Sequence, residues 1–160
     1  MGRTDTASLV VDAPLSRVYA ALIQPQALVE WLPPRGMSAE FEYFDARTGG
    51  SYRMKLTYAE APESGGKSGV DSDVVDVRFV EVVPDDRVVQ AVDFQSDDPL
   101  FAETMTMTWT VTAVSTGSTR VDVRADDVPE GISAGDHVDG LRSSLKNLAT
   151  YLTRPRAYPD

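Results

Sequence analysis

The alternation of side chains over residues 103–114 constrains the fold more than any other feature of this chain. Apolar and threonine side chains occupy alternate positions there, which is typical of a β-strand with one buried and one solvated face. The apolar positions are Met105, Met107, Trp109 and Val111, and the threonines between and before them are Thr104, Thr106, Thr108 and Thr110. Such a strand belongs in an antiparallel sheet that other elements cover on one face only.

The rest of the chain provides neighbouring strands and helices to cover them. Further strand patterns lie at about 6–12, 37–44, 52–58, 74–83, 87–95 and 119–128. Two short helices, each begun by a proline, are expected at about 14–23 and 25–31. Leucines at helical spacing predict a long helix from about 134 to 153, with Ser133 as its N-cap.

Consecutive strands joined by short turns pair in antiparallel fashion, and one amphipathic helix covers one concave face of their sheet. We therefore predict an α+β fold in which a curved antiparallel sheet of about seven strands wraps around the C-terminal helix. A chain of 160 residues is most simply one domain. We expect that domain to span residues 1–160, with a core of about 6–153.

Two connections between the strands carry specific expectations. Gly49 and Gly50 predict a tight hairpin turn with at least one glycine at positive φ. Residues 59–73 are rich in Gly, Ser and acidic side chains, so a mobile loop is expected there, with Asp71 and Asp73 in solvent.

Charge and composition narrow the classes of function. A net charge of −10 disfavours binding to nucleic acid or to an anionic membrane surface, and no apolar run is long enough to span a bilayer. The chain has no cysteine and a single histidine, so we expect no disulfide, no metal site and no cofactor. A cytoplasmic location fits these features best.

Several short motifs, in this order, carry a resemblance to a known family. They are Ala13-Pro14, Trp31-Leu32, the segment 45–52 with Gly49-Gly50, Glu81 to Pro84, and His137 to Leu141. The chain resembles the START-like (SRPBCC) helix-grip superfamily, and within it the bacterial single-domain relatives of the activator of Hsp90 ATPase. Two departures, Tyr19 and Leu141 where relatives often have Trp, are expected to alter the shape of an apolar pocket.

The resemblance implies a cavity between the sheet and the C-terminal helix. Inward-facing aromatic and methionine side chains are the candidate ligand contacts, because Met adapts to varied ligands and Tyr and Trp carry polar groups. The candidates are Trp31, Tyr52, Met54, Phe79, Phe94, Met105, Met107 and Trp109 on the early helices and strands, with His137, Leu141 and Leu145 on the last helix. Arg53, Tyr52, Trp109 and His137 are the groups expected to orient a ligand. Plain core packing is the alternative for each apolar residue.

The sequence leaves three functions open. The leading hypothesis is binding of a small apolar or aromatic ligand, and the second is a cyclase, dehydratase or hydrolase with His137 as acid–base. The enzyme hypothesis requires His137 in the cavity beside a carboxylate or a tyrosine hydroxyl. A structural histidine that fixes the helix start against a strand is the competing interpretation of His137. The third function is an interaction module that resembles the Hsp90 activator. A chaperone partner is less favoured by the acidic charge, and a homodimer is left open.

Overall fold

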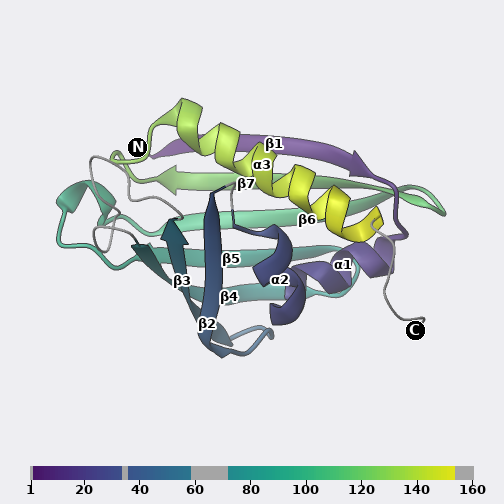
Figure 1. The fold of residues 1–160 in the computed structure, drawn as a ribbon, viewed down its shortest axis with the longest axis horizontal. Helices are drawn as coiled ribbons and strands as arrows, with labels where there is room; N and C mark the ends of the chain where they lie inside the picture. The colour runs from purple at the N-terminus through teal and green to yellow at the C-terminus, as the bar shows by residue number, and fades with distance from the viewer. Residues whose placement is uncertain (1, 34–35, 59–71, 154–160) are drawn as a thin grey trace.

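The computed structural model describes residues 2–33, 36–58 and 72–153, and it confirms the predicted α+β helix-grip fold (Figure 1). The elements follow one another as β1 (Arg3–Val11), α1 (Leu15–Ile23), α2 (Pro25–Trp31), β2 (Met37–Phe44), β3 (Ser51–Tyr58), β4 (Ser72–Val83), β5 (Arg87–Phe94), a 3₁₀ turn η1 (Pro99–Phe101), β6 (Met105–Ser115), β7 (Ser118–Val128) and α3 (Ala134–Thr153). No helix among these described residues is long and apolar enough to cross a membrane.

The seven strands form one antiparallel sheet in the order β1-β7-β6-β5-β4-β3-β2. Figure 1 shows the three helices on the same side of this sheet, with α3 running along β1. The inward positions of β7 are buried, as the alternation predicts: Val121, Val123 and Ala125 are at most 1% exposed. The hydrophobic core therefore lies between the concave face of the sheet and the helices.

Local hydrogen bonds explain where the helices begin and how they are held together. The Asp136 backbone N–H donates to Ser133 Oγ at 3.1 Å, which confirms the predicted N-cap of α3. Trp31 Nε1 donates to the Ala21 carbonyl at 2.9 Å and ties α2 to α1. Ser144 Oγ donates to the Leu32 carbonyl at 2.7 Å and ties α3 to the end of α2.

The Gly49-Gly50 turn is present, and its two glycines are needed for different reasons. Gly49 has φ of +87°, which confirms the expected positive φ. Gly50 lies outside the left-handed region, but a Cβ built there would lie 2.1 Å from the Asp45 carbonyl oxygen. The turn is also bonded to β4, because Gly49 N–H donates to Phe79 O at 2.8 Å and Phe79 N–H donates to Gly50 O at 2.8 Å.

Several expectations about the strands need correction. Residues 72 and 73 belong to β4 and not to a loop, and Asp73 is only 1% exposed, so its expected place in solvent was wrong. Its carboxylate accepts a hydrogen bond from the Tyr58 hydroxyl at 2.8 Å, which offsets the loss of hydration. The remainder of the predicted loop, 59–71, lies outside the described residues.

The simple alternation predicted for β2 also fails. The register shifts between Phe41 and Tyr43, so Tyr43 is exposed and Phe44 packs against the core instead. A bulge adds one residue to one strand and reverses the facing of the side chains beyond it. The first strand begins at Arg3, earlier than expected, which brings Asp5 into the sheet.

Candidate functional site

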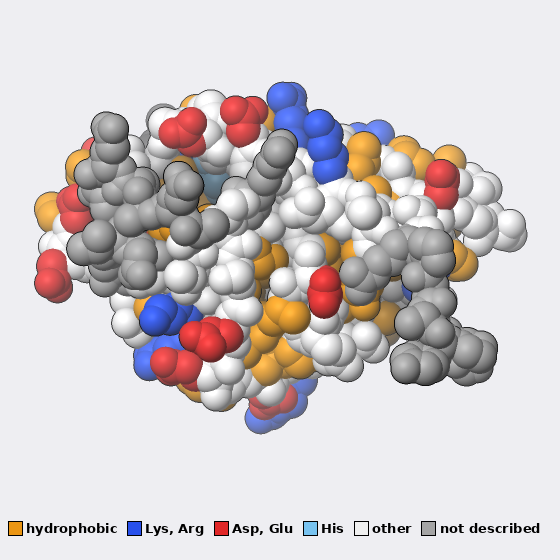
Figure 2. Space-filling model, in the orientation of Figure 1, with side chains coloured by type: hydrophobic (Ala, Val, Ile, Leu, Met, Phe, Trp, Pro, Cys, Tyr) orange, Lys and Arg blue, Asp and Glu red, His pale blue; other side chains and the backbone are white. Residues whose placement is uncertain are grey.

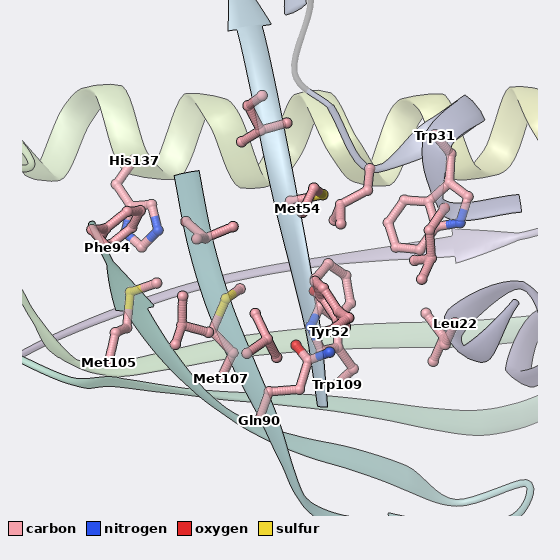
Figure 3. Close-up of a pocket in the computed structure, with 16 residues that line it drawn as sticks. Leu22, Trp31, Tyr52, Met54, Gln90, Phe94, Met105, Met107, Trp109 and His137 are labelled. Carbon is pink, nitrogen blue, oxygen red and sulfur yellow. The ribbon is translucent and has the colours of Figure 1, made fainter. Parts of the chain in front are cut away.

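A pocket of about 170 Å³ lies between the sheet and the helices (Figure 3). Its wall is built by both layers of the fold. The lining residues are Leu22 of α1, Leu28 and Trp31 of α2, Leu32 just after it, Tyr52, Met54 and Leu56 of β3, Val75 and Val77 of β4, Gln90, Val92 and Phe94 of β5, Met105, Met107 and Trp109 of β6, and His137 of α3. Figure 2 shows hydrophobic side chains at the surface of the same face, around α2.

The structure brings eight of the eleven predicted site residues to this pocket. They are Trp31, Tyr52, Met54, Phe94, Met105, Met107, Trp109 and His137. The other three lie elsewhere in the core. Phe79 packs its ring against Phe44 and Tyr52, with centroids 6.0 and 5.6 Å apart, and Leu141 and Leu145 belong to the buried stripe of α3. Whether any of the eight contacts a ligand stays a prediction.

Two further expectations about the pocket are not met. Arg53 alternates with Tyr52 and Met54 on β3, so it faces away from the pocket and bonds through Nε to Asp76 Oδ1 at 2.6 Å. Tyr19 and Leu141 are both buried, but neither lines the pocket. These two departures from the family pattern therefore change the packing of the core and not the pocket wall.

One end of the pocket is formed by two tryptophans. The rings of Trp31 and Trp109 meet edge to face, with centroids 5.4 Å apart. The Trp31 N–H is already bonded to Ala21 O, so this side chain presents only its apolar surface to the pocket. Figure 3 places Leu22 and Trp31 at this end and Phe94, Met105 and His137 at the other.

A polar pair, Tyr52 and Gln90, lies in the middle of the pocket (Figure 3). Burial raises the pKa of the Tyr52 hydroxyl, and a hydrogen bond with Gln90 lowers it by a smaller amount, so the phenol stays neutral near pH 7. Sequence reasoning missed Gln90, which is 6% exposed. The signal was available, because Gln90 shares a strand face with Val88 and Val92, where a polar side chain is unusual.

A second polar group lies at the opposite end of the pocket from Trp31, where α3 begins against β1. His137 Nδ1 lies 2.7 Å from Asp5 Oδ2, and the two side chains are 13% and 5% exposed. Arg3 donates to the same carboxylate through Nε and Nη2, at 3.0 to 3.2 Å, and Nη2 also donates to Ile132 O at 2.6 Å. His137 thus fixes the helix start against a strand and also lines the pocket.

The charge state of Asp5 follows from these contacts. Burial raises the pKa of the Asp5 carboxyl, but hydrogen bonds from Arg3 and His137 outweigh that effect and hold the pKa below its usual value. Sequence reasoning missed Asp5 because the first strand was expected to start at Thr6. Extending the strand backwards would have found it, since Asp5 shares a face with Ala7, Leu9 and Val11.

Within the part of the chain that the structure describes, no group of three or more His, Asp or Glu side chains could hold a metal ion. The geometry is that of a helix-grip domain, in which a curved antiparallel sheet and a long C-terminal helix face each other across a pocket. The chain belongs to the family of Activator of Hsp90 ATPase homolog 1-like proteins, whose model matches residues 12–153. The family resemblance stated from the sequence is thereby confirmed.

Solved structures support the same fold. Protein CV1439 from Chromobacterium violaceum is 29% identical, with a TM-score of 0.80 over 96% of this chain and 99% of that one. A protein from Arthrobacter aurescens is 17% identical, with a TM-score of 0.79 over 95% of this chain and 87% of that one, and shows the fold alone. Among curated proteins, none matches this sequence.

Proposed function

We propose that this protein binds a small apolar or aromatic molecule in the pocket between the sheet and the helices. The observation that carries the proposal is the wall of that pocket, which is aliphatic, aromatic or methionine apart from the polar groups of Gln90, Tyr52 and His137 and the N–H of Trp109. An apolar wall favours entry of a hydrophobic ligand, and a few polar groups within it set the ligand's orientation.

The volume limits the size of the ligand. An apolar cavity of about 150 Å³ in another protein accepts a benzene molecule, and the pocket here is about 170 Å³. The best-fitting occupant is therefore a single ring with few substituents. Met54, Met105 and Met107 provide flexible side chains that adjust to its outline.

The test is a titration of the protein with benzene, followed through the methyl signals of its five methionines in NMR spectra. Saturable shifts of pocket methionines, with about one ligand per protein, are expected. Met107→Trp should fill the pocket and weaken benzene binding by about tenfold or more while the protein remains folded. Thr108→Trp places the same side chain on the opposite face of β6 and is the matched control.

The same benzene titration can also contradict the proposal. If benzene produces no saturable shift, or if Met107→Trp and Thr108→Trp weaken its binding equally, the pocket is not the ligand site. If Met107→Trp instead unfolds the protein by overpacking, at a cost of about 1–3 kcal/mol or more, the space is part of a solid core.

One observation favours a second function, acid–base catalysis in the same pocket. His137 lines the pocket with a carboxylate, Asp5, on its Nδ1 atom, which is the arrangement that the enzyme hypothesis requires. A molecule that co-purifies with the protein, identified by native mass spectrometry, would be the natural substrate to test. Conversion by the wild type but not by His137→Gln would support catalysis, and unchanged ligand in both would exclude it for that compound.

A further inference from the structure

The contact between Asp5 and His137 determines which nitrogen the histidine can offer to a ligand. An ionised carboxylate only accepts hydrogen bonds, so the 2.7 Å contact requires the hydrogen to be on His137 Nδ1. In the neutral ring the other nitrogen, Nε2, then carries a lone pair and is an acceptor. Asp5 in this way sets the tautomer of a side chain that lines the pocket.

The acceptor is held rigidly and without excess negative charge. Arg3 bonds to both oxygens of the Asp5 carboxylate and to Ile132 O, so the carboxylate is fixed in position and its charge is balanced. Ser133 caps the first turn of α3, and the His137 backbone N–H donates to Ser133 O at 2.9 Å. The imidazole is therefore preorganised before any ligand arrives.

Nothing in the described ranges 2–33, 36–58 and 72–153 bonds to Nε2 of His137. The end of the pocket around it is made of Phe94, Met105 and Met107, none of which carries a strong donor (Figure 3). The side chains of Tyr52 and Gln90, the other polar pair of the pocket, are hydrogen-bonded to each other. An acceptor at an otherwise apolar end of the pocket indicates a ligand that brings its own donor.

We propose that the ligand is a phenol-type compound, a single aromatic ring whose hydroxyl donates a hydrogen bond to Nε2 of His137. This inference rests on the proposed function and adds the chemical class of the ligand to it. The ring lies among Met54, Met105 and Met107, and its hydroxyl meets the one lone pair that Asp5 orients. Asp5 and Arg3 are positioning residues, because they act through His137.

The comparison of phenol with benzene measures this interaction directly. A hydroxyl that enters an apolar pocket loses its hydration, so without an acceptor phenol binds less tightly than benzene. With an acceptor in place, the wild type should bind phenol about as tightly as benzene or more tightly. In His137→Leu, phenol affinity should fall about tenfold, whereas benzene affinity should change by less than about threefold.

Asp139→Leu is the control variant, because it introduces the same side chain at an exposed position two residues further along α3. It should leave the affinities for both ligands unchanged. A loss of phenol binding in this variant equal to the loss in His137→Leu would overturn the proposal, because the effect would then come from the helix and not from Nε2.

A second measurement uses the unaltered protein and does not depend on whether a variant folds. His137 is the sole histidine, so its two ring nitrogens give the only imidazole signals in a ¹⁵N spectrum. The spectrum of the neutral ring should show the Nδ1–H tautomer, because the contact with Asp5 requires the hydrogen on Nδ1. Phenol should shift the Nε2 signal, and benzene should bind without a comparable shift.

The outcomes separate this inference from the proposed function. If benzene binds but phenol leaves Nε2 unshifted, or if His137→Leu weakens both ligands equally, the inferred ligand class is wrong and the apolar site stands. An Nε2–H tautomer in the free protein would also overturn the inference. If neither benzene nor phenol binds, both the proposed function and the inference fail.

Discussion

Two neighbouring regions of the same concave face are packed in opposite ways. On β2 to β4, the rings of Phe41, Phe44, Tyr52 and Phe79 contact one another with centroids 5.0 to 6.0 Å apart and fill the space under the sheet. Towards β5 and β6, Phe94, Met105 and Met107 face the same side but leave a pocket, whose wall the ends of β3 and β4 complete. We call the first region the aromatic cluster.

The difference shows what makes a pocket in this fold. Rigid rings that meet edge to face fill space efficiently and pack to the density of a protein interior. The methionine side chains are flexible and do not pack as interlocking rings, so the space beside them stays available. Tyr52 belongs to both regions, since its ring packs in the aromatic cluster while Gln90 bonds to its hydroxyl at the pocket wall.

The largest effect is expected inside the aromatic cluster. Phe79 is 1% exposed and contacts two other rings, so Phe79→Ala should lower the free energy of unfolding by about 3–5 kcal/mol. Met107→Ala, at the half-buried pocket wall, should cost only about 1 kcal/mol, because less surface is buried and space already lies beside it. Urea unfolding measures both. Equal costs would show that the two regions are packed alike.

The second prediction tests the turn that supports the aromatic cluster. Gly50→Ala should lower the free energy of unfolding by about 1–3 kcal/mol, because the new Cβ would collide with Asp45 O and disturb the bonds to Phe79. Gly117, in the β6–β7 turn, has no atom within 4 Å of a built Cβ, so Gly117→Ala is the matched control and should have little effect. A Gly50→Ala melting temperature equal to that of the wild type would contradict the steric explanation.

The third prediction concerns the helix start that holds His137 at the pocket. Ser133→Ala removes the acceptor for the Asp136 N–H and should cost about 1 kcal/mol by urea unfolding. Ser133→Asp, which restores an N-cap acceptor, should recover most of that loss. If Ser133→Asp is as unstable as Ser133→Ala, the cap contributes nothing and another contact holds this turn.

The smallest effect is the dependence of stability on pH through Asp5. The folded-state pKa of Asp5 lies below its ordinary value of 3.8, because hydrogen bonds from Arg3 and His137 outweigh burial. The carboxylate therefore stabilises the fold above the unfolded pKa, and this contribution is lost as pH falls through the folded pKa. Urea unfolding between about pH 6 and pH 2 should show a steeper loss for the wild type than for Asp5→Asn.

An exposed aspartate provides the control for the pH experiment. Asp97→Asn should lose stability with falling pH as steeply as the wild type does, because the Asp97 side chain lies in solvent. If Asp5→Asn keeps the full slope of the wild type, the acid sensitivity originates from other carboxylates, such as Asp76 and Asp126, whose pKa values hydrogen bonds also hold low.

Most of the fold could be predicted from the sequence, because its signals are local. Alternation over residues 103–114 indicates a half-buried strand, prolines mark the starts of the first two helices, and Ser133 marks the start of the third. The same periodicity predicts which side chains of the strands face inward. Five of them line the pocket: Tyr52, Met54, Met105, Met107 and Trp109. These features depend only on neighbours along the chain.

The candidate site could be predicted only in part. Alternation along a strand shows which face of the sheet a side chain takes but not which side chains it contacts there. Phe79 and Met107 are both predicted to face inward, but Phe79 packs against another ring and Met107 lines the pocket. The bulge in β2 exposes Tyr43 and brings Phe44 into the aromatic cluster, a change that alternation alone does not show. Asp5 and Gln90 share strand faces with apolar residues, but the pocket residues that they bond to, His137 and Tyr52, are distant in the chain.

The sequence by itself therefore determined the order of the elements, the buried face of most strands, the N-cap of α3 and the family. Only the tertiary structure decided where the pocket lies and what its polar groups are. Asp5 and His137 are 132 residues apart in the chain, and they meet because α3 packs along β1. The physical reason is that periodicity and capping are properties of adjacent residues, whereas a cavity and a hydrogen bond across it depend on how whole elements pack.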